Sequence, residues 1–398
     1  GLGRIAVLTS DEVDSLRLCL DGLAQRYQQG EYILDVPFED SHSAIEAFVT
    51  QQLGEVGQKI HTGRSRNDQV LVATRLYLKQ QLATLRACCL HVIEVLLARA
   101  QQDEMMPMPG YTHLQRAVPS SVGLWLGAYA ESFVDNVRHL DHVLELVDQC
   151  PLGAAAGYGV NLPLDREGVA AELGFAKVQN NAMYVQNSRG KFELLALQAL
   201  GQVTLDVRRL AWDLSLYTSS EFDFVRLPAA LRTGSSIMPN KSNPDLIELL
   251  RALHPMVLAG QVELDAILAL PSAYHRDMQA SKPALLRPWV KAQAGLSLLA
   301  KMLGQMTLVA ESLAEAMEEE MLATDRAIHA AVASGGVFRR AYGESMDKGE
   351  PIGSEARDLE GDIEQSLKDR VSPGGCGDLG LQKIHDEFQW LVKNQSQK

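Results

Sequence analysis

The chain has 398 residues, of which 46% are hydrophobic and 22% charged, a composition typical of soluble globular proteins. This length allows a large buried core and would fit two or three domains. The net charge of −13 argues against nucleic acid and acidic membrane surfaces as partners. An anionic substrate would therefore need locally placed Arg, Lys or helix N-termini. No apolar run approaches the roughly 18 residues of a membrane span.

The chain opens with Gly1-Leu2-Gly3-Arg4, shows no signal-peptide pattern, and contains five cysteines without CxxC spacing. Adjacent Cys88 and Cys89 would diverge by about 100° on a helix. We interpret the cysteines as reduced structural thiols and expect a cytoplasmic location. The sequence has no Cys/His cluster and no nucleotide-binding loop, so neither a metal nor an organic cofactor is predicted.

Residues 1–62 are typical of a small domain of short helices with acidic edges. Asp11 to Gly30 forms one helical stretch, and Asp40 offers a cap for a second helix that carries His42. We predict an N-terminal helical domain over these 62 residues.

Five long helical stretches follow, with almost no strand alternation. Apolar spacing, caps and prolines place them near 67–101, 120–149, 187–219, 243–270 and 283–322. An Asn67/Asp68 cap would begin the first stretch, and Pro255 should kink the fourth. These stretches define a central domain over 63–322, and shorter helical stretches define a small C-terminal domain over 323–398.

Several of the long helices are apolar on more than one face, as in residues 194–200. Helices of this kind are buried on several sides. We therefore predict an all-α chain, in which a central bundle of five long helices is flanked by two small helical domains and assembles into a multi-chain helical bundle. A single large monomeric α-domain is the alternative.

One loop between the third and fourth long helices is rich in groups that can hold an anion. It reads Gly234-Ser235-Ser236-Ile237-Met238-Pro239-Asn240-Lys241-Ser242-Asn243-Pro244. Its glycine permits close approach to a ligand, and its N–H groups and Lys241 attract negative charge. Asn243 and Pro244 are typical of an N-cap and first position of a helix, whose N-terminus also favours anions. The residues alone indicate an anion-holding loop with a serine nucleophile or base; a plain helix connector is the alternative.

A second segment, His61-Thr62-Gly63-Arg64-Ser65-Arg66-Asn67-Asp68-Gln69, lies just ahead of the first long helix. Guanidinium groups pair bidentately with carboxylates, and the helix end adds N–H donors. The segment favours carboxylate binding, and a solvated basic turn is the alternative.

These segments resemble a known family. The pattern Gly-Ser-Ser-x-Met-Pro-x-Lys-x-Asn over 234–243 resembles the signature of the fumarase/aspartase superfamily of lyases. Residues 61–69 and the stretch Gly110-Tyr111-Thr112-His113-Leu114-Gln115-Arg116 narrow the resemblance to the argininosuccinate lyase family. The likeness covers most of the chain and is strongest from about Asp40 to Lys282. It implies reversible β-elimination of argininosuccinate to arginine and fumarate, in arginine biosynthesis and the urea cycle.

The resemblance also implies roles for individual residues. Ser235 would remove the Cβ proton of the substrate, with Ser236 the less favoured base, and Lys241 would stabilise the developing negative charge. His113 would transfer a proton, oriented by Glu248. The remaining implied contacts are with the substrate: Ser65, Arg66, Asn67, Thr112, Asn243, Tyr274, Gln279 and Lys282.

The sequence departs from the family pattern at a few positions. Asn240 and Ser242 replace the usual glutamine and second lysine of the signature loop. Ser188 stands where the family usually has an arginine, so that Arg189 or Lys191 would have to substitute for it. The family also has several dozen residues ahead of this starting point, so we expect the N-terminal domain to be truncated.

Helix length bears on how a site could form. If the five helices alternate in direction, segments 61–69 and 274–282 lie at one end, and 110–116 and 234–248 lie roughly 45 Å away. One site can use all four only if antiparallel-related chains bring opposite ends together. The homotetramer of the family, with each site built from three chains, satisfies this. Two alternatives remain: a related fumarate-releasing lyase with another substrate, and a non-catalytic structural paralogue such as a lens crystallin.

Overall fold

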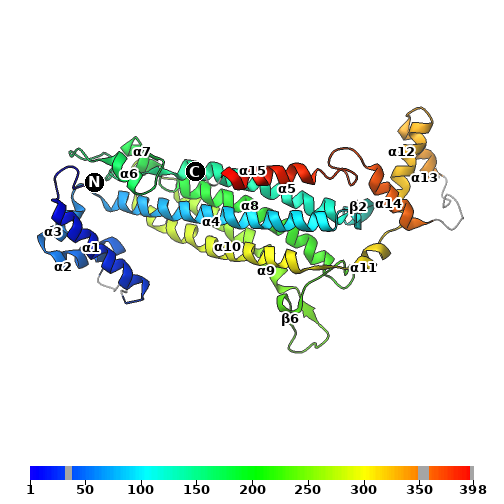
Figure 1. Ribbon diagram of the computed structural model, residues 1–398, viewed down its shortest axis with the longest axis horizontal. Helices are drawn as coiled ribbons and strands as arrows, with labels where there is room; N and C mark the ends of the chain where they lie inside the picture. The colour runs from blue at the N-terminus through cyan, green and yellow to red at the C-terminus, as the bar shows by residue number, and fades with distance from the viewer. Residues whose placement is uncertain (32–37, 348–357, 395–398) are drawn as a thin grey trace. The chain divides into compact units, whose positions relative to one another are not determined.

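The computed structural model describes residues 1–31, 38–347 and 358–394, and α-helices dominate them (Figure 1). Spatial contacts group the chain into two compact units. Unit 1 comprises Gly1–Ala83, His142–Leu197 and Gly260–Leu286, and unit 2 comprises Thr84–Asp141, Gln198–Ala259 and Arg287–Lys398. The division into domains at 62/63 and 322/323 remains a prediction beside this grouping.

Five long helices carry the fold, and they confirm the all-α class. They are α4 (Arg66–Gln102), α5 (Val122–Val147), α8 (Lys191–Tyr217), α9 (Asp245–Ile267) and α10 (Ser281–Gln305). Each corresponds to one of the five predicted stretches.

The fifth predicted stretch, 283–322, is wrong beyond Gln305. The chain there forms β8 (Thr307–Leu308), then α11 (Ala310–Glu315) and the 3₁₀ helix η4 (Glu319–Leu322). Strand β8 pairs antiparallel with β5 (Val225–Arg226). This backbone pairing competes with helix formation, and the β-branched side chain of Thr307 favours it.

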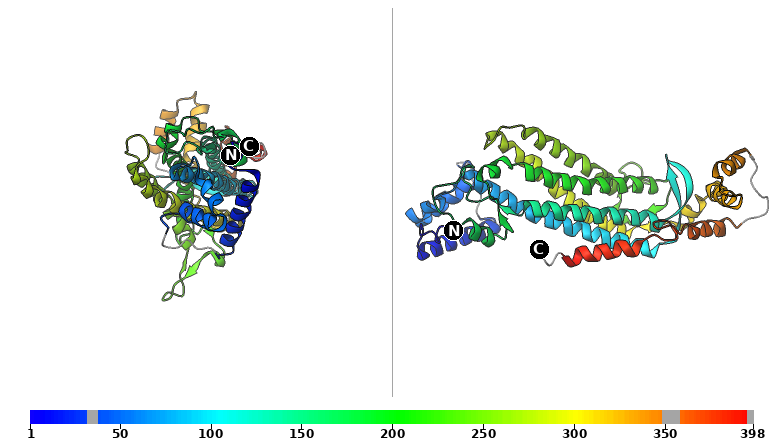
Figure 2. Two further views of the ribbon diagram at one scale, coloured as in Figure 1. Left: turned by 90° about the vertical axis from the view of Figure 1, so that its left-hand side faces the viewer. Right: turned by 90° about the horizontal axis from the view of Figure 1, so that it is seen from above.

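The expectation of almost no strand structure missed a β-hairpin. Strand β1 (Pro107–Thr112) pairs antiparallel with β2 (Gln115–Ser121), and the hairpin is visible in cyan at one end of the long helices in Figure 2, right. Prolines lie opposite each other at Pro109 and Pro119. Because proline donates no ladder hydrogen bond and none of the usual strand alternation is present, the segment is not typical of a strand.

The first two helices of unit 1 each begin at a capping residue, and the sequence predicted the second of these caps. Helix α1 (Ser10–Gln28) begins with a capping box between Thr9 and Glu12. Helix α2 (Ser41–Leu53) begins at Asp40, whose carboxylate accepts the Ser43 N–H at 2.7 Å, which confirms the predicted cap. The remaining helical elements and strands of the unit are short: α3 (Glu55–Gln58), η1 (Lys59–His61), β3 (Gln149–Cys150), α6 (Arg166–Glu172), β4 (Lys177–Val178), α7 (Ala182–Asn187) and η3 (Arg276–Ala280).

Unit 2 ends in four helices that match the expected C-terminal stretches: α12 (Ala323–Ala333), α13 (Phe338–Asp347), α14 (Leu359–Asp369) and α15 (Leu381–Asn394). The apolar face of α15 is buried. Arg86 of α4 holds this helix in place, because it pairs with Asp141 at 2.7 Å and donates to the Leu391 carbonyl at 2.8 Å. The remaining short elements of the unit are η2 (Ala229–Leu231), β6 (Thr233–Gly234) and β7 (Ser242–Asn243).

Helix α4 contains one window of 18 residues that is long and apolar enough to cross a membrane, which the sequence analysis did not anticipate. Half of that window is buried inside the structure. The core helix of a soluble protein has the same properties. Leu78, Leu82 and Leu85 of this helix are fully buried, as core packing requires.

Candidate active site

The segment that opens α4 is fixed by its own side chains. The Ser65 hydroxyl accepts the Asn67 N–H at 3.3 Å, and the Asp68 carboxylate accepts the Ser65 N–H at 3.0 Å. Ser65 is therefore the N-cap residue of α4, and the predicted Asn67/Asp68 cap is wrong because it lies two to three residues too far along the chain. The side chain of Asn67 is thereby left at the helix start, free of the capping role.

Asp68 also ties the start of α4 to a neighbouring loop. Its second carboxylate oxygen accepts the N–H groups of Gly153 and Ala155, at 3.0 and 2.9 Å. The side chain is fully buried, yet both of its oxygens are hydrogen-bonded. Three backbone donors from two segments thus converge on one carboxylate and set the position of residues 65–68.

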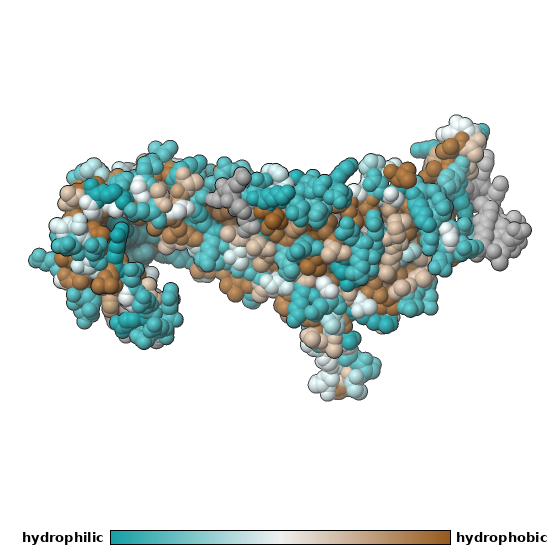
Figure 3. Space-filling view, viewed as in Figure 1, coloured by the Kyte–Doolittle hydropathy of each residue, from teal (hydrophilic) through white to brown (hydrophobic). Residues whose placement is uncertain are grey.

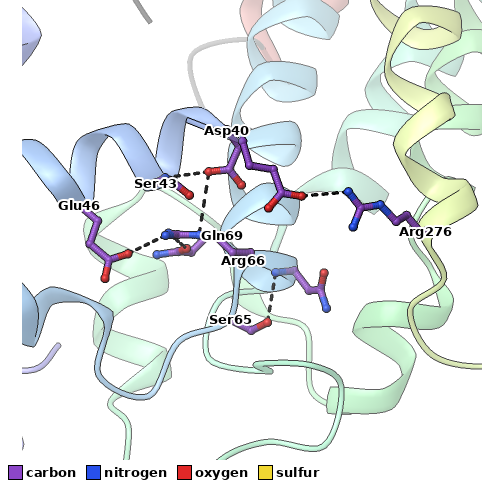
Figure 4. Close-up of polar contacts among 9 residues, drawn as sticks. Asp40, Ser43, Glu46, Ser65, Arg66, Gln69 and Arg276 are labelled. Atoms are coloured by element: carbon purple, nitrogen blue, oxygen red, sulfur yellow. Dashed lines mark hydrogen bonds and ion pairs between the residues drawn. The ribbon is translucent and has the colours of Figure 1, made fainter. Parts of the chain in front are cut away.

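Arg66 is held by polar groups of α2 and α4 (Figure 4). Its guanidinium lies 2.6 Å from Glu46 and 4.0 Å from Asp40, and it donates to Gln69 at 3.2 Å. Two carboxylates therefore neutralise this arginine within unit 1. Sequence reasoning missed Glu46, because nothing local in the sequence relates it to a residue twenty positions away.

Three of the predicted substrate contacts, Tyr274, Gln279 and Lys282, are brought together by the structure, and we call them the gripping set. The Lys282 ammonium donates to Gln279 at 2.6 Å, and Gln279 donates to the Tyr274 hydroxyl at 3.2 Å. Burial lowers the pKa of Lys282, and the nearby charge of Arg189 lowers it further. Three residues of one loop and the following helix thus form a continuous hydrogen-bonded chain.

Arg189 lies against this chain. Its guanidinium stacks over the Tyr274 ring at 4.8 Å from the centroid. The residue is 6% exposed, and within the described part of the chain its buried Nη1 atom has no hydrogen-bond partner. Burial lowers its pKa, which the charges of Tyr274 and Glu193 oppose. Arg189 therefore lies beside the gripping set with a buried N–H donor that has no acceptor in the described part of the chain.

Ser188 and Lys191, which lie near Arg189 in the sequence, make different contacts. Ser188 is fully buried, donates to the Val185 carbonyl at 3.1 Å and accepts from Gln179 at 2.8 Å. Lys191 donates to the Tyr184 hydroxyl at 3.3 Å. Ser188 is thus a structural residue, and Lys191 is engaged with a different tyrosine from the one that Arg189 contacts.

His113 lies in unit 2, at the tip of the β1–β2 hairpin. Thr112 pairs with Gln115, so His113 and Leu114 form a two-residue turn with φ of 55° and 58°. Such left-handed values at both turn positions are typical of a type I′ turn, which normally takes asparagine and glycine. The tip therefore holds the imidazole in an unusual backbone conformation for this residue type.

A cavity of about 640 Å³ adjoins His113. Its wall includes Trp125 and Tyr129 of α5, which donate to the Asp213 carboxylate of α8 at 3.0 and 2.7 Å. Burial raises the pKa of Tyr129, and Asp213 adds to this effect. The wall of the cavity therefore combines aromatic rings with two carboxylates, because Asp206 also lines it and accepts a hydrogen bond from Asn136 at 2.7 Å.

The signature loop rises from a short ladder in unit 2. Thr233 pairs with Asn243 and Gly234 pairs with Ser242. Helix α9 begins at Asp245, and the Pro244 carbonyl accepts the Glu248 N–H at 3.3 Å, so the predicted Asn243 cap falls one residue early. Asn243 is engaged at the base of the loop by its backbone, while Lys241 lies exposed within the loop.

The Ser235 hydroxyl oxygen accepts two backbone N–H groups. They come from Ile237 at 3.3 Å and Met238 at 3.1 Å. Two donors aimed at one oxygen favour negative charge on it. The loop therefore provides, from its own backbone, part of what a serine base would need.

Within the described residues of unit 2, no hydrogen bond or ion pair joins Glu248 to His113, or either of them to Ser235. Glu248 instead lies 3.8 Å from Arg251, one turn further along α9. The three groups come from different elements of the unit. Their catalytic association remains a prediction.

No group of three or more His, Cys, Asp or Glu side chains in the described ranges could hold a metal ion. All five cysteines are free. The predicted site residues, catalytic and substrate-binding together, fall into two sets: Ser65, Arg66, Asn67, Tyr274, Gln279 and Lys282 belong to unit 1, and Thr112, His113, Ser235, Lys241, Asn243 and Glu248 belong to unit 2.

Comparison with known proteins identifies close relatives of this chain. A family model described as Lyase matches residues 3–258. The chain is 51% identical over 391 residues to an argininosuccinate lyase of Stenotrophomonas maltophilia (strain R551-3). The matched region covers 98% of this chain and 89% of that protein. An argininosuccinate lyase of Xanthomonas oryzae pv. oryzae (strain PXO99A) matches with the same identity and coverage.

Solved structures share the fold at lower identity. EDDS lyase in complex with formate superposes with a TM-score of 0.81 at 22% identity, over 99% of this chain and 84% of that chain. A class II fumarase from Schistosoma mansoni superposes with a TM-score of 0.72 at 16% identity, over 94% and 86% of the two chains. These likenesses support the all-α architecture.

Proposed function

Because the chain belongs to the argininosuccinate lyase family, we propose that it cleaves argininosuccinate reversibly into arginine and fumarate. The observation that carries this function is the match to curated argininosuccinate lyases along nearly the whole chain. The chain is accordingly a carbon–nitrogen lyase of amino-acid biosynthesis. The expected pathway is arginine biosynthesis, with the urea cycle as the corresponding route where that cycle operates.

The anionic part of the substrate is assigned to the gripping set. Lys282 supplies positive charge, and the hydrogen bonds among Tyr274, Gln279 and Lys282 support a preorganised arrangement. Arg189 is the arginine that compensates for Ser188, because its buried Nη1 has no acceptor and it stacks on Tyr274. Lys191 is the weaker candidate, since it already contacts Tyr184.

At the start of α4, Asn67 is assigned to direct substrate contact. Ser65 and Arg66 contribute mainly by holding it, because the Ser65 hydroxyl caps the helix and carboxylates pair with Arg66. Thr112 and Asn243 complete the proposed contacts, beside His113 and at the base of the signature loop respectively.

The reaction begins with removal of the Cβ proton by Ser235. The electron pair of that C–H bond is taken up by the adjacent carboxylate as an aci-carboxylate. It then forms the double bond of fumarate as the Cα–N bond breaks, and the departing nitrogen takes up a proton. Backbone donation from Ile237 and Met238 to the Ser235 oxygen supports an alkoxide, and Lys241 adds positive charge for the developing aci-carboxylate. His113 transfers a proton, with Glu248 as the group that orients it.

We further propose a cytoplasmic homotetramer in which several chains contribute to each site. This is supported by the exposed apolar side chains on the long helices. Figure 3 shows hydrophobic residues interspersed among hydrophilic ones on one face. Among the exposed apolar side chains are Leu205, Trp212, Leu249, Leu258, Val290 and Leu298.

The test is fumarate release, followed by ultraviolet absorbance, after purified protein is mixed with argininosuccinate. Adenylosuccinate, aspartate and malate are run in parallel. Release from argininosuccinate alone is the expected result. Release from one of the others instead would assign the chain to a different substrate, and release from none would favour a structural paralogue.

A further inference from the structure

An ion pair on β2 holds the hairpin whose turn carries His113. Tyr111 of β1 and Arg116 of β2 are paired directly behind the Thr112–Gln115 pair. The Arg116 guanidinium forms an ion pair with Glu318, the residue just ahead of η4. Glu318 thus connects the hairpin to a separate segment of unit 2.

The other strand is anchored by aromatic packing. The Tyr111 ring contacts the Phe222 ring edge to face, with centroids 5.7 Å apart. Phe222 in turn contacts Phe224 at 5.2 Å and Tyr217 at 6.2 Å. Burial raises the pKa of Tyr111, and its contact with Arg116 offsets part of that rise. Each strand of the hairpin is therefore fixed by a residue two or three positions from His113.

The turn itself needs such support. His113 and Leu114 both adopt left-handed backbone angles, which side chains other than glycine or asparagine rarely adopt. Leu114 is 70% exposed, so packing of its own side chain does little to hold the turn. A turn with this geometry depends on the strands below it to keep the imidazole in one direction.

We propose that Arg116 is a positioning residue for the proton transfer by His113, and that it acts through its ion pair with Glu318. This rests on the role of His113 in the proposed function. Arg116 need not touch the substrate: the backbone ladder sets the register of β2, and the ion pair restrains the strand beside the turn and thereby the direction in which the imidazole projects. A small misplacement of a catalytic group lowers the rate of the chemical step more than it weakens substrate binding.

Unit 2 contains a matched control for this ion pair. Arg138 pairs with Glu387 at 3.0 Å, and its side-chain exposures of 48% and 45% resemble the 42% and 46% of Arg116 and Glu318. The control pair joins α5 to α15 and is remote in sequence from the hairpin. Exposed ion pairs of this kind contribute little to stability, so both pairs should be dispensable for folding.

The experiment compares Arg116→Gln, Glu318→Gln and Arg138→Gln by steady-state fumarate release from argininosuccinate. We expect kcat to fall on the order of ten-fold in the two hairpin variants, with little change in KM, and both constants to stay near wild type in Arg138→Gln. The charge swap Arg116→Glu with Glu318→Arg should restore most of kcat. Arg116→Lys, which keeps the charge, should lie between the wild type and Arg116→Gln.

Three results would overturn the proposal: kcat unchanged in Arg116→Gln, a loss confined to KM, or a charge swap no better than the single variants. His113→Asn is measured in parallel to separate the two hypotheses. If His113→Asn retains full turnover, the proposed role of His113 fails. If only His113→Asn is impaired, the proposed function stands and the role of Arg116 fails.

Discussion

The chemistry of single residues depends first on how a serine hydroxyl could act as a base. Serine is a poor base in water, and Ser235 lies in a loop that is largely exposed. The two backbone N–H groups that already donate to its oxygen lower the cost of an alkoxide. No comparable pair of donors reaches the Ser236 hydroxyl among the described hydrogen bonds, so the two adjacent serines are chemically distinct.

Replacing Ser235 with alanine should lower kcat for fumarate release by about 10²–10⁴-fold, the usual contribution of general base catalysis. Ser236→Ala is the matched control and should keep turnover close to wild type. Thermal unfolding of both variants should be unchanged, because neither side chain is buried. Undiminished turnover in Ser235→Ala would contradict the mechanism.

His42 introduces a pH dependence into unit 1. Burial lowers its pKa below the ordinary value of 6.5, helped by the charges of Arg66, His61 and Lys282 and opposed by Asp40. The folded state therefore binds this proton less tightly than the unfolded chain does. The contribution of neutral His42 to the free energy of unfolding is therefore complete above about pH 6.5, and it is lost as the pH falls through and below that value.

His42→Gln cannot titrate, so its midpoint of thermal unfolding should decline less between about pH 8 and pH 5 than that of the wild type. Differential scanning calorimetry at several pH values would measure both slopes. Equal slopes for the two proteins would show that His42 does not contribute to the acid sensitivity.

At the level of elements, the start of α4 depends on one buried carboxylate. Asp68 accepts N–H groups from Ser65, Gly153 and Ala155. Asp68→Asn keeps the shape but replaces one acceptor with a donor, which leaves at least one backbone N–H unsatisfied. We expect a loss of about 2 kcal/mol in the free energy of unfolding, measured by urea denaturation.

Asp21→Asn provides the comparison, because Asp21 is an exposed residue of α1. It should change the free energy of unfolding by no more than about 0.5 kcal/mol. A loss in Asp68→Asn no larger than this control would contradict the structural role assigned to Asp68.

The long helices could be predicted from sequence because their apolar spacing persists over many turns. The hairpin could not, since Pro107, Pro109 and Pro119 remove the alternation and donors by which strands are recognised. Beyond Gln305 the sequence still favours helix, but backbone pairing with β5 overrides that preference. Local caps such as Asp40 were predictable, because all the atoms involved lie within a few residues.

The candidate site was predictable only as far as motifs extend. Family resemblance supplied the roles of Ser235, His113 and Lys282. It gave no means of finding that Glu46 pairs with Arg66, or that Arg189 has an unpaired buried nitrogen. Those facts depend on contacts between segments distant in sequence, which no local pattern specifies.

At the level of the whole molecule, the exposed apolar residues of the long helices bear on assembly. Leu258 of α9 is 47% exposed, whereas Leu18 of α1 is 77% exposed. If the long helices pack against other copies, Leu258→Glu should introduce a buried charge and shift the protein to smaller species, with lower activity. Leu18→Glu should leave assembly unchanged. Sedimentation velocity and fumarate release would measure both variants.

A stable monomer with full turnover would contradict a site shared between chains. A tetramer that persists in Leu258→Glu would instead place the interface elsewhere on the helices.

The hairpin that presents His113 also limits how the chain can vary in length. Surface turns usually tolerate insertions. Here one added residue between Thr112 and Gln115 would abolish the two-residue turn. If the strand pairing shifts by one residue to absorb it, every side chain of the shifted strand turns to the opposite face. Arg116 would then point away from Glu318 and the imidazole away from its present direction. The spacing of this segment is therefore under as much constraint as the identity of its residues.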